Sequence, residues 1–204
     1  TRLKDNLSNT EIFTSTSVVQ SDKVNLEDIL ISSTNVNFSG VSSRPRYFQI
    51  RGIGEYEQYA SQGGPTYYVA TYIDNFNYSG LGMPVSLFDV DQVEIIKGSQ
   101  SYCFGQNALG GLVKIKTNKP KPFREIKFKA GFGSFDKKKF SFVINQPLFG
   151  AVNLRIGTSK HTDRGFIFND FIDDYSNKRD ELTSNFQISY SKHFSSDNQL
   201  YLLF

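Results

Sequence analysis

The 204-residue sequence contains one cysteine, two histidines, one methionine and no tryptophan. A single cysteine, Cys103, cannot form an intramolecular disulfide, and His161 and His193 lie too far apart in the sequence to form a zinc motif. We expect Cys103 to be a small buried residue, with a free reactive thiol as the alternative. The sequence therefore predicts no metal site and no disulfide framework.

Long apolar runs are also missing, because no stretch approaches the roughly 18 apolar residues that a membrane-spanning helix needs. The first four residues lack the apolar core of a signal peptide. The net charge is only +3, from 23 basic and 20 acidic residues, so the composition indicates no general surface for polyanions. Aromatic residues, by contrast, make up 15% of a chain whose mean hydropathy is -0.38, which favours half-buried strands over a helical bundle.

Motifs for enzymatic chemistry are lacking as well. No Gly-x-Ser-x-Gly elbow occurs, neither histidine has a motif partner, and the paired carboxylates Asp173 and Asp174 lie in a polar stretch where solvation explains them. Five aspartates between positions 163 and 180 offer oxygen ligands for calcium, but their spacing matches no EF-hand. The glycines near Arg51 do not form a dinucleotide-binding loop, because Glu57 stands where the third glycine is required. We therefore expect no enzyme activity and no cofactor.

The segment Gln92–Thr117 is the most informative part of the sequence. Apolar residues over 93–96 predict a short buried strand that ends at Gly98, and alternation over 113–117 predicts a second strand with one wet face. Between the two strands, glycines indicate a compact turn, with a possible helical turn, in which backbone approaches backbone closely. These glycines are Gly105, Gly110 and Gly111.

Together with two upstream elements, this segment resembles the plug domain of TonB-dependent outer-membrane receptors. The first upstream element, Arg51-Gly52-Ile53-Gly54, resembles the family's RGxG element. The second, Tyr72-Ile73-Asp74, resembles its YxDG-like element. The three elements follow one another in the order found in the family.

The resemblance implies energy-coupled uptake of a scarce solute across the outer membrane of a Gram-negative bacterium. The commonest cargo is a ferric siderophore, with haem, cobalamin and oligosaccharide as alternatives. The implied partners are TonB, which would bind a segment upstream of this chain, outer-membrane lipid, and a small-molecule ligand such as an iron chelate. Because Thr1-Arg2 resembles residues that follow the TonB box, we expect the chain to be a fragment that lacks both ends.

The resemblance also implies roles for individual residues. Arg51 and Glu94 are expected to pair with charges of the plug or barrel, with solvated or backbone-satisfied contacts as the alternative. Two loops at the plug apex are expected to face the ligand, although packing against the barrel wall is the alternative for their tyrosines. The candidate ligand-binding residues are Tyr56, Tyr59, Gln62 and Tyr78. The structural motif residues are Gly52, Gly54, Asp74, Gly98, Gly105, Gly110 and Gly111.

Pro120 and Pro122 mark a change in the pattern of the sequence. Residues 1–120 predict an α+β plug domain, with a small mixed sheet and short helices. From 121 to 204, apolar and polar residues alternate in successive runs, and short connections alternate with a long one over 160–181. This pattern is typical of antiparallel strands of a transmembrane β-barrel, apolar toward lipid and polar toward the lumen. The piece is too short to close a barrel around a plug, so the barrel is expected to be truncated.

Local signals in the first part predict individual elements. Asn25 is expected to cap a short helix that buries Leu26, Ile29 and Leu30 on one face. The run Ser17–Val19 predicts the first strand, and the Ser/Asn-rich stretch Ser32–Val41 predicts a loop.

A nucleic-acid-binding function is the alternative to the receptor. Residues 124–142 combine lysines and phenylalanines in the manner of strands on which single-stranded bases stack. The same residues also alternate as a lipid-facing hairpin, and the net charge of the chain is weak. The sequence therefore favours the receptor and predicts no nucleic-acid partner.

Overall fold

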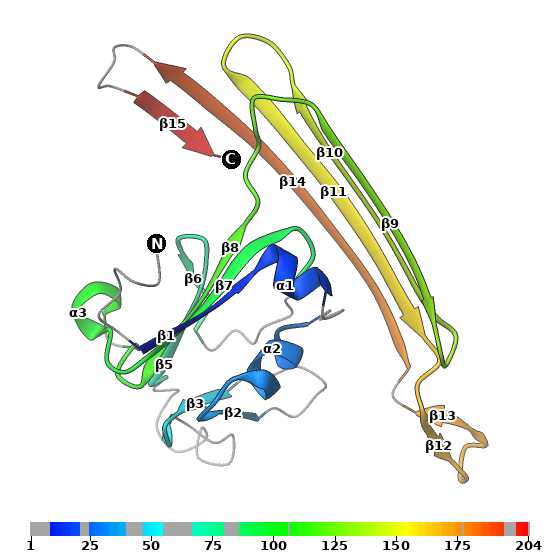
Figure 1. The fold of residues 1–204 in the computed structure, drawn as a ribbon. Helices are drawn as coiled ribbons and strands as arrows, with labels where there is room; N and C mark the ends of the chain where they lie inside the picture. Colours follow the sequence, from blue (N-terminus) through cyan, green and yellow to red (C-terminus); the bar gives the residue numbers. More distant parts are fainter. Residues whose placement is uncertain are drawn as a thin grey trace. The chain divides into compact units, whose positions relative to one another are not determined.

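The structure, a computed structural model, describes residues 9–20, 25–39, 47–54, 67–79, 86–105, 107–176, 178–193 and 199–203. The chain divides into two compact units, Thr1–Asn118 and Lys119–Phe204. Figure 1 shows short helices and small sheets in the first unit and long strands in the second. The predicted fold class is confirmed: an α+β unit with a small mixed sheet is followed by a sheet of long antiparallel strands.

A five-stranded mixed sheet forms the centre of the first unit. Within it, only β5 and β8 pair in parallel, and the other neighbours are antiparallel. The strand order β1-β7-β8-β5-β6 puts β8 in the middle and β1 at an edge. The strands predicted over residues 93–96 and 113–117 are confirmed. Their bounds are β1 (Asn9–Thr14), β5 (Val69–Ile73), β6 (Phe76–Asn77), β7 (Val90–Lys97) and β8 (Gly111–Thr117).

A second sheet contains β2 (Val36–Ser39), β3 (Tyr47–Ile50) and β4 (Ile53–Gly54). The loop predicted over Ser32–Val41 is therefore wrong in its central part. Antiparallel pairing of β2 with β3 satisfies the backbone of a stretch whose Ser and Asn residues would otherwise favour turns.

The helices of the first unit are short. They are α1 (Ser15–Gln20), α2 (Leu26–Ser32) and α3 (Ser101–Phe104). Within the described residues, none of the helices has the length and apolar character to cross a membrane. The strand predicted over Ser17–Val19 is wrong, since these residues belong to α1. A short apolar run does not distinguish strand from helix, and Thr14 begins the helix by accepting the Ser17 N–H at 3.4 Å.

The prediction of α2 is confirmed. Asn25 precedes the helix, and its N–H donates to the Asp28 carboxylate at 3.0 Å. The acidic side chains of the first turn lie at the positive end of the helix dipole. The predicted apolar face, Leu26, Ile29 and Leu30, is fully buried.

The core of the first unit lies where apolar side chains of α2 meet those of the sheets. Val93, Ile95, Val113 and Ile115 of the central strands belong to it. A smaller cluster gathers around Ala70, Ala108 and Leu112. Cys103 belongs to neither cluster and is exposed, so the prediction that it is buried is wrong. It lies on α3, a four-residue helix that buries none of its side chains.

The second unit is one antiparallel sheet in the order β15-β14-β11-β10-β9, with a separate hairpin β12–β13. Figure 1 shows β9, β10, β11 and β14 side by side and the hairpin at one end of them. The strands predicted from alternation are confirmed, and the long connection is shorter than predicted because β11 and β14 extend into it. The bounds are β9 (Glu125–Gly133), β10 (Lys137–Pro147), β11 (Val152–Asp163), β12 (Ile167–Asn169), β13 (Asp174–Ser176), β14 (Arg179–His193) and β15 (Gln199–Leu203).

Candidate functional site

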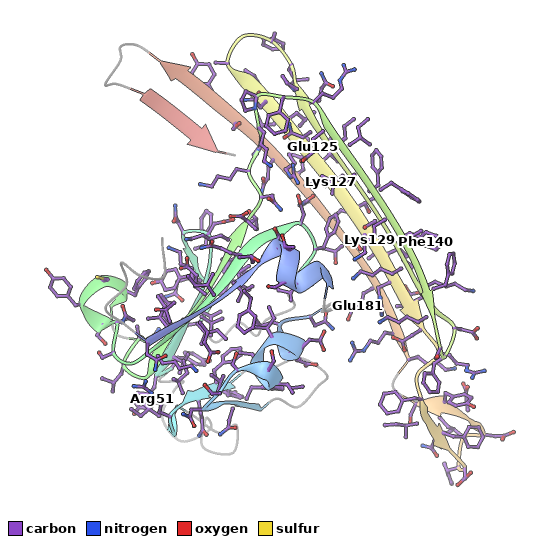
Figure 2. All side chains as sticks on the ribbon, in the orientation of Figure 1. Arg51, Glu125, Lys127, Lys129, Phe140 and Glu181 are labelled. Carbon is purple, nitrogen blue, oxygen red and sulfur yellow. The ribbon has the colours of Figure 1, made fainter. Side chains whose placement is uncertain are left out.

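The turn between β3 and β4 contains the first of the three sequence elements, and Figure 2 labels its arginine. Arg51 and Gly52 have φ angles of 55° and 79°, and the Arg51 N–H donates to the Asn35 carbonyl at 2.9 Å. The Arg51 side chain is exposed. At Gly54, an added Cβ would lie 2.1 Å from the Phe48 carbonyl oxygen. Only glycine allows β4 to approach β3 this closely.

The glycine-rich connection between β7 and β8 is held by backbone hydrogen bonds, both within the connection and to Tyr68. The N–H groups of Gly98, Gln100 and Gly110 donate to carbonyls of the first unit at 3.1, 2.7 and 2.7 Å. These three donors are consumed internally, so they are not available to cradle a phosphate. At Gly111, an added Cβ would lie 2.5 Å from the Ile96 carbonyl oxygen. The glycines thus serve close backbone packing.

The central sheet contains an ion pair between the buried Glu94 and the partly exposed Lys116. Glu94 is 6% exposed, and the Lys116 ammonium lies 2.6 Å from its carboxylate. Gln92 donates a second hydrogen bond to the same carboxylate. All three residues lie on the adjacent strands β7 and β8. Arg51 and Glu94, the two residues predicted to pair with charges, lie on different sheets.

A second polar network joins the edge strand β1 to β7. The Lys97 ammonium, on a side chain that is 3% exposed, pairs with the Glu11 carboxylate. It also donates to the Thr34 carbonyl at 2.7 Å and to its hydroxyl at 2.8 Å. Burial acts to raise the pKa of Glu11, but the hydrogen bonds from Lys97 and Thr34 outweigh it and lower that pKa. The sequence contains no local signal for this network, because its members are separated by 23 and 86 positions.

Two aspartates hold the chain where it leaves the first unit. The Asp74 carboxylate accepts the Thr117 N–H at 3.0 Å and the Thr117 hydroxyl at 2.8 Å. Asp89 accepts the Asn118 N–H on its carbonyl at 3.0 Å and the Asn118 side-chain amide at 3.1 Å. The predicted motif residue Asp74 therefore ties the turn after β5 to the end of β8. Asp89, which the sequence analysis missed, has the same role from the segment before β7.

Only one of the four candidate ligand-binding residues is described by the structure. Tyr78 follows β6, is half-buried and packs against the main core. The other three, Tyr56, Tyr59 and Gln62, lie outside the described residues.

In the second unit, polar and apolar residues occupy opposite faces of the sheet. On β11, Asn153, Arg155, Ser159 and His161 alternate along the strand and are buried. The apolar residues of the other face are largely exposed. This distribution is the inverse of a water-soluble sheet and fits strands with an apolar outer face. The exposed residues include Ile126, Phe128, Phe132, Phe140, Phe142, Ile156, Leu182 and Phe186.

The same geometry bears on nucleic-acid binding. In the β9–β10 hairpin, Phe140 pairs opposite Ala130, so it shares a face with the phenylalanines of β9. Lys127 and Lys129, labelled in Figure 2, occupy the alternate positions and hence the other face. Stacking of bases together with neutralisation of phosphates needs aromatic and basic side chains on one surface. The hairpin places Lys127 and Lys129 away from the phenylalanines, and only Lys138, opposite Phe132, shares their face among the lysines of its two strands.

Charges on the polar face pair within the sheet. The guanidinium of Arg155, which is fully buried, lies 3.2 Å from the Glu125 carboxylate. Lys127 lies at the same distance from the other oxygen of that carboxylate. In the part of the chain that the structure describes, no three His, Cys, Asp or Glu side chains gather in a group able to hold a metal ion.

Comparisons with known proteins agree with this architecture. The family profile described as TonB-dependent Receptor Plug Domain matches residues 2–112. A pesticin receptor of Yersinia pestis is 26% identical over 128 residues, which cover 60% of this chain and 17% of the relative. The metal-pseudopaline receptor CntO of Pseudomonas aeruginosa is 32% identical over 79 residues, which cover 38% of this chain and 11% of that protein. The chain thus spans less than a fifth of the length of these relatives.

Solved structures share the fold. The ferric yersiniabactin uptake receptor FyuA from Yersinia pestis has a TM-score of 0.76 at 18% identity, covering 91% of this chain and 29% of its own. The pyoverdine receptor FpvA from Pseudomonas aeruginosa, bound to pyoverdine, has a TM-score of 0.75 at 15% identity, covering 98% and 27%.

Proposed function

The chain belongs to the TonB-dependent receptor family, and from this membership we propose that it is part of an outer-membrane transporter for a ferric siderophore. Residues 1–120 form the plug and residues 121–204 the first barrel strands of that transporter. Uptake is driven by energy that TonB delivers to a segment upstream of the chain. The protein carries its ligand across the membrane without making or breaking a covalent bond, so it is not an enzyme.

One observation carries this proposal: a sheet with an apolar face exposed follows directly on a plug-type unit in the same chain. An exposed apolar row would cause aggregation in water, but it is the surface that a lipid bilayer requires. Outer-membrane lipid is therefore the partner of the second unit, and the outer membrane of a Gram-negative bacterium is its location.

The proposed cargo rests on the relatives. The names of several similar proteins refer to siderophores or metal chelates, among them the receptors for yersiniabactin, pyoverdine and metal-pseudopaline. An iron chelate is a bulky solute with aromatic or polar groups that tyrosine rings and amides can contact. The proposed contacts on the plug are Tyr56, Tyr59, Gln62 and Tyr78.

Uptake by the full-length receptor tests the function. The receptor is produced in a Gram-negative strain that lacks its own siderophore receptors, and accumulation of radioactive iron is measured from hydroxamate, catecholate and thiazoline-type chelates. We expect accumulation of at least one chelate, and its loss when TonB is deleted. Accumulation that is absent for every chelate, or independent of TonB, contradicts the proposal.

Arg51 and Glu94 test the link between the plug and transport. Arg51→Ala removes an exposed cation and is expected to lower uptake while the amount of receptor in the outer membrane is unchanged. Arg124→Ala, which removes an exposed cation from the second unit, is the control. Unchanged uptake in Arg51→Ala would remove this residue from the mechanism. Glu94→Gln, which removes the charge of the buried carboxylate that pairs with Lys116, is tested in the same assay.

A further inference from the structure

The segment just after the plug is held by one buried side chain. Asn145, on β10, is fully buried. Its side-chain oxygen accepts the Lys121 N–H at 2.8 Å, and its amide donates to the Lys121 carbonyl at 2.9 Å. The amide also donates to the Phe123 carbonyl. The side chain thus forms a clasp on the peptide backbone of residues 121–123, which we call the linker clasp.

Prolines explain why a side chain is needed here. The regular pairing of β9 with β10 stops at Glu125 opposite Asn145. Upstream of that point, Pro120 and Pro122 have no N–H, so they cannot donate to a strand ladder. Lys121 has the one N–H between them. The Asn145 side chain accepts this N–H and donates to the carbonyls of Lys121 and Phe123. These hydrogen bonds replace the strand pairing that the prolines prevent.

The position of the clasp sets the length of chain between the two units. The first unit ends at Asn118, which Asp89 holds, and the clasp begins at Lys121. Three residue steps can span at most about 10 Å when fully extended. Without the clasp, the first fixed point is Glu125 at the start of β9. Seven steps then span about 25 Å, so the maximum length of free linker between the plug and the barrel strands more than doubles.

We propose that Asn145 is a positioning residue that limits how far the carboxyl end of the plug can move from the barrel wall. The inference rests on the proposed transport function, because it concerns the movement of the plug during uptake. Asn145 touches no ligand in this role. It acts through the linker, which it fixes to the second barrel strand.

The test uses Asn145→Asp in the full-length receptor. Aspartate has the same shape as asparagine and still accepts the Lys121 N–H, but it turns two donor contacts into repulsion between oxygens. Asn145→Ala serves as a second variant that removes the clasp without adding charge. Asn153→Ala is the matched control, because Asn153 is also a buried asparagine, 8% exposed, on the next strand.

Two measurements are made without any siderophore, so an error in the proposed ligand leaves them unchanged. Exchange of the Lys121 N–H, which Asn145 accepts, is expected to be at least tenfold faster in Asn145→Ala, where the acceptor is gone, and unchanged in the control. Cells with either variant are expected to become more permeable to vancomycin, a solute too large for general porins, at equal amounts of receptor in the outer membrane. A role in folding alone would lower the amount of receptor without raising the permeability per receptor.

Three results would overturn the proposal. Exchange in the linker that is as slow as in the unaltered receptor means that Asn145 does not hold it. Faster exchange with unaltered permeability means that the clasp does not limit the plug. Equal leakage from Asn153→Ala means that any change on the polar face loosens the receptor.

Discussion

The network of Glu11, Lys97 and Thr34 makes an asymmetric prediction. The Lys97 side chain is 3% exposed, whereas that of Glu11 is 27% exposed. Glu11→Gln therefore leaves a buried ammonium with only neutral acceptors. Lys97→Met leaves a carboxylate on a partly exposed side chain, which the Thr34 hydroxyl still contacts at 2.9 Å. We expect the change at the more exposed residue to cost more stability.

The magnitudes follow from burial. Breaking a buried pair by removing one partner costs roughly 3 to 5 kcal/mol, and partial access of water to Glu11 reduces this to about 2 kcal/mol for Glu11→Gln. The loss for Lys97→Met is expected to be about 1 kcal/mol, as for pairs near the surface. The double variant buries no charge, so its cost should not exceed that of Glu11→Gln alone.

Hydrogen exchange of the β1 amides in the full-length receptor measures these costs. At about 1.4 kcal/mol per tenfold change, exchange should be about 30-fold faster in Glu11→Gln and about 5-fold faster in Lys97→Met. Glu27→Gln, in the first turn of α2, is the control and should leave β1 unchanged. If Lys97→Met costs as much as Glu11→Gln, or if the two costs add, the account of the network is wrong.

The pH dependence of the network has a definite sign. The pKa of Glu11 is lower in the folded protein than its ordinary value of 4.5, so the unfolded chain binds a proton more readily as the pH falls. The stabilisation is therefore complete above pH 4.5 and is lost as the pH falls through the folded-state pKa. Protection of β1, corrected for intrinsic exchange, should decrease in this range. Glu11→Gln should abolish that decrease, and its persistence would assign the effect to another group.

Three further changes test the packing, the exit of the plug and the membrane face. Gly111→Ala forces a Cβ against a β7 carbonyl and should destabilise the plug to urea by about 3 kcal/mol. In Gly52→Ala the new Cβ meets no atom within 4 Å, and the loss of stability should be about 1 kcal/mol. Equal losses of stability for Gly111→Ala and Gly52→Ala would refute the predicted clash at Gly111. Asp74→Ala removes two hydrogen bonds from Thr117 at the end of β8 and should cost about 2 kcal/mol of stability, measured by the same urea titration. An unchanged stability would refute the role of Asp74 in holding the end of β8. Phe128→Lys puts a charge on the exposed apolar row and should reduce membrane insertion by about 2 to 4 kcal/mol, whereas Lys129→Gln on the other face should insert normally, as judged by heat-modifiable mobility.

Elements with a complete local signal could be predicted from the sequence. The strand β7 follows from a run of apolar residues that ends at glycine, and α2 follows from Asn25 with three apolar residues on one face. The barrel strands follow from strict alternation, because the period of two residues is a property of the strand itself. The three sequence elements, taken in their order, predicted the family, which the profile match confirms.

Elements that depend on distant partners could not be predicted. β2 has only four residues, lies within a stretch rich in Ser and Asn, and is held by its pairing with β3. The contacts of Lys97 and Asn145 bridge 86 and 24 positions, and no local pattern marks residues separated by such distances. The exposure of Cys103 depends on which face of a four-residue helix meets the sheet, and four residues are too few for a periodic pattern. The predicted pairing roles of Arg51 and Glu94 stay predictions.

The order of strands in the plug sheet has a mechanical consequence. β1 is bonded along one side only, to β7, while β8 is bonded to β7 and β5 at once. A force applied at the N-terminal end of the domain can separate β1 from β7 one hydrogen bond at a time and leave the remaining four strands paired. A force applied at the C-terminal end, on β8, must break the pairing with β7 and the pairing with β5 at the same time. Mechanical unfolding of the domain is therefore expected to begin at β1 and to reach β8 last.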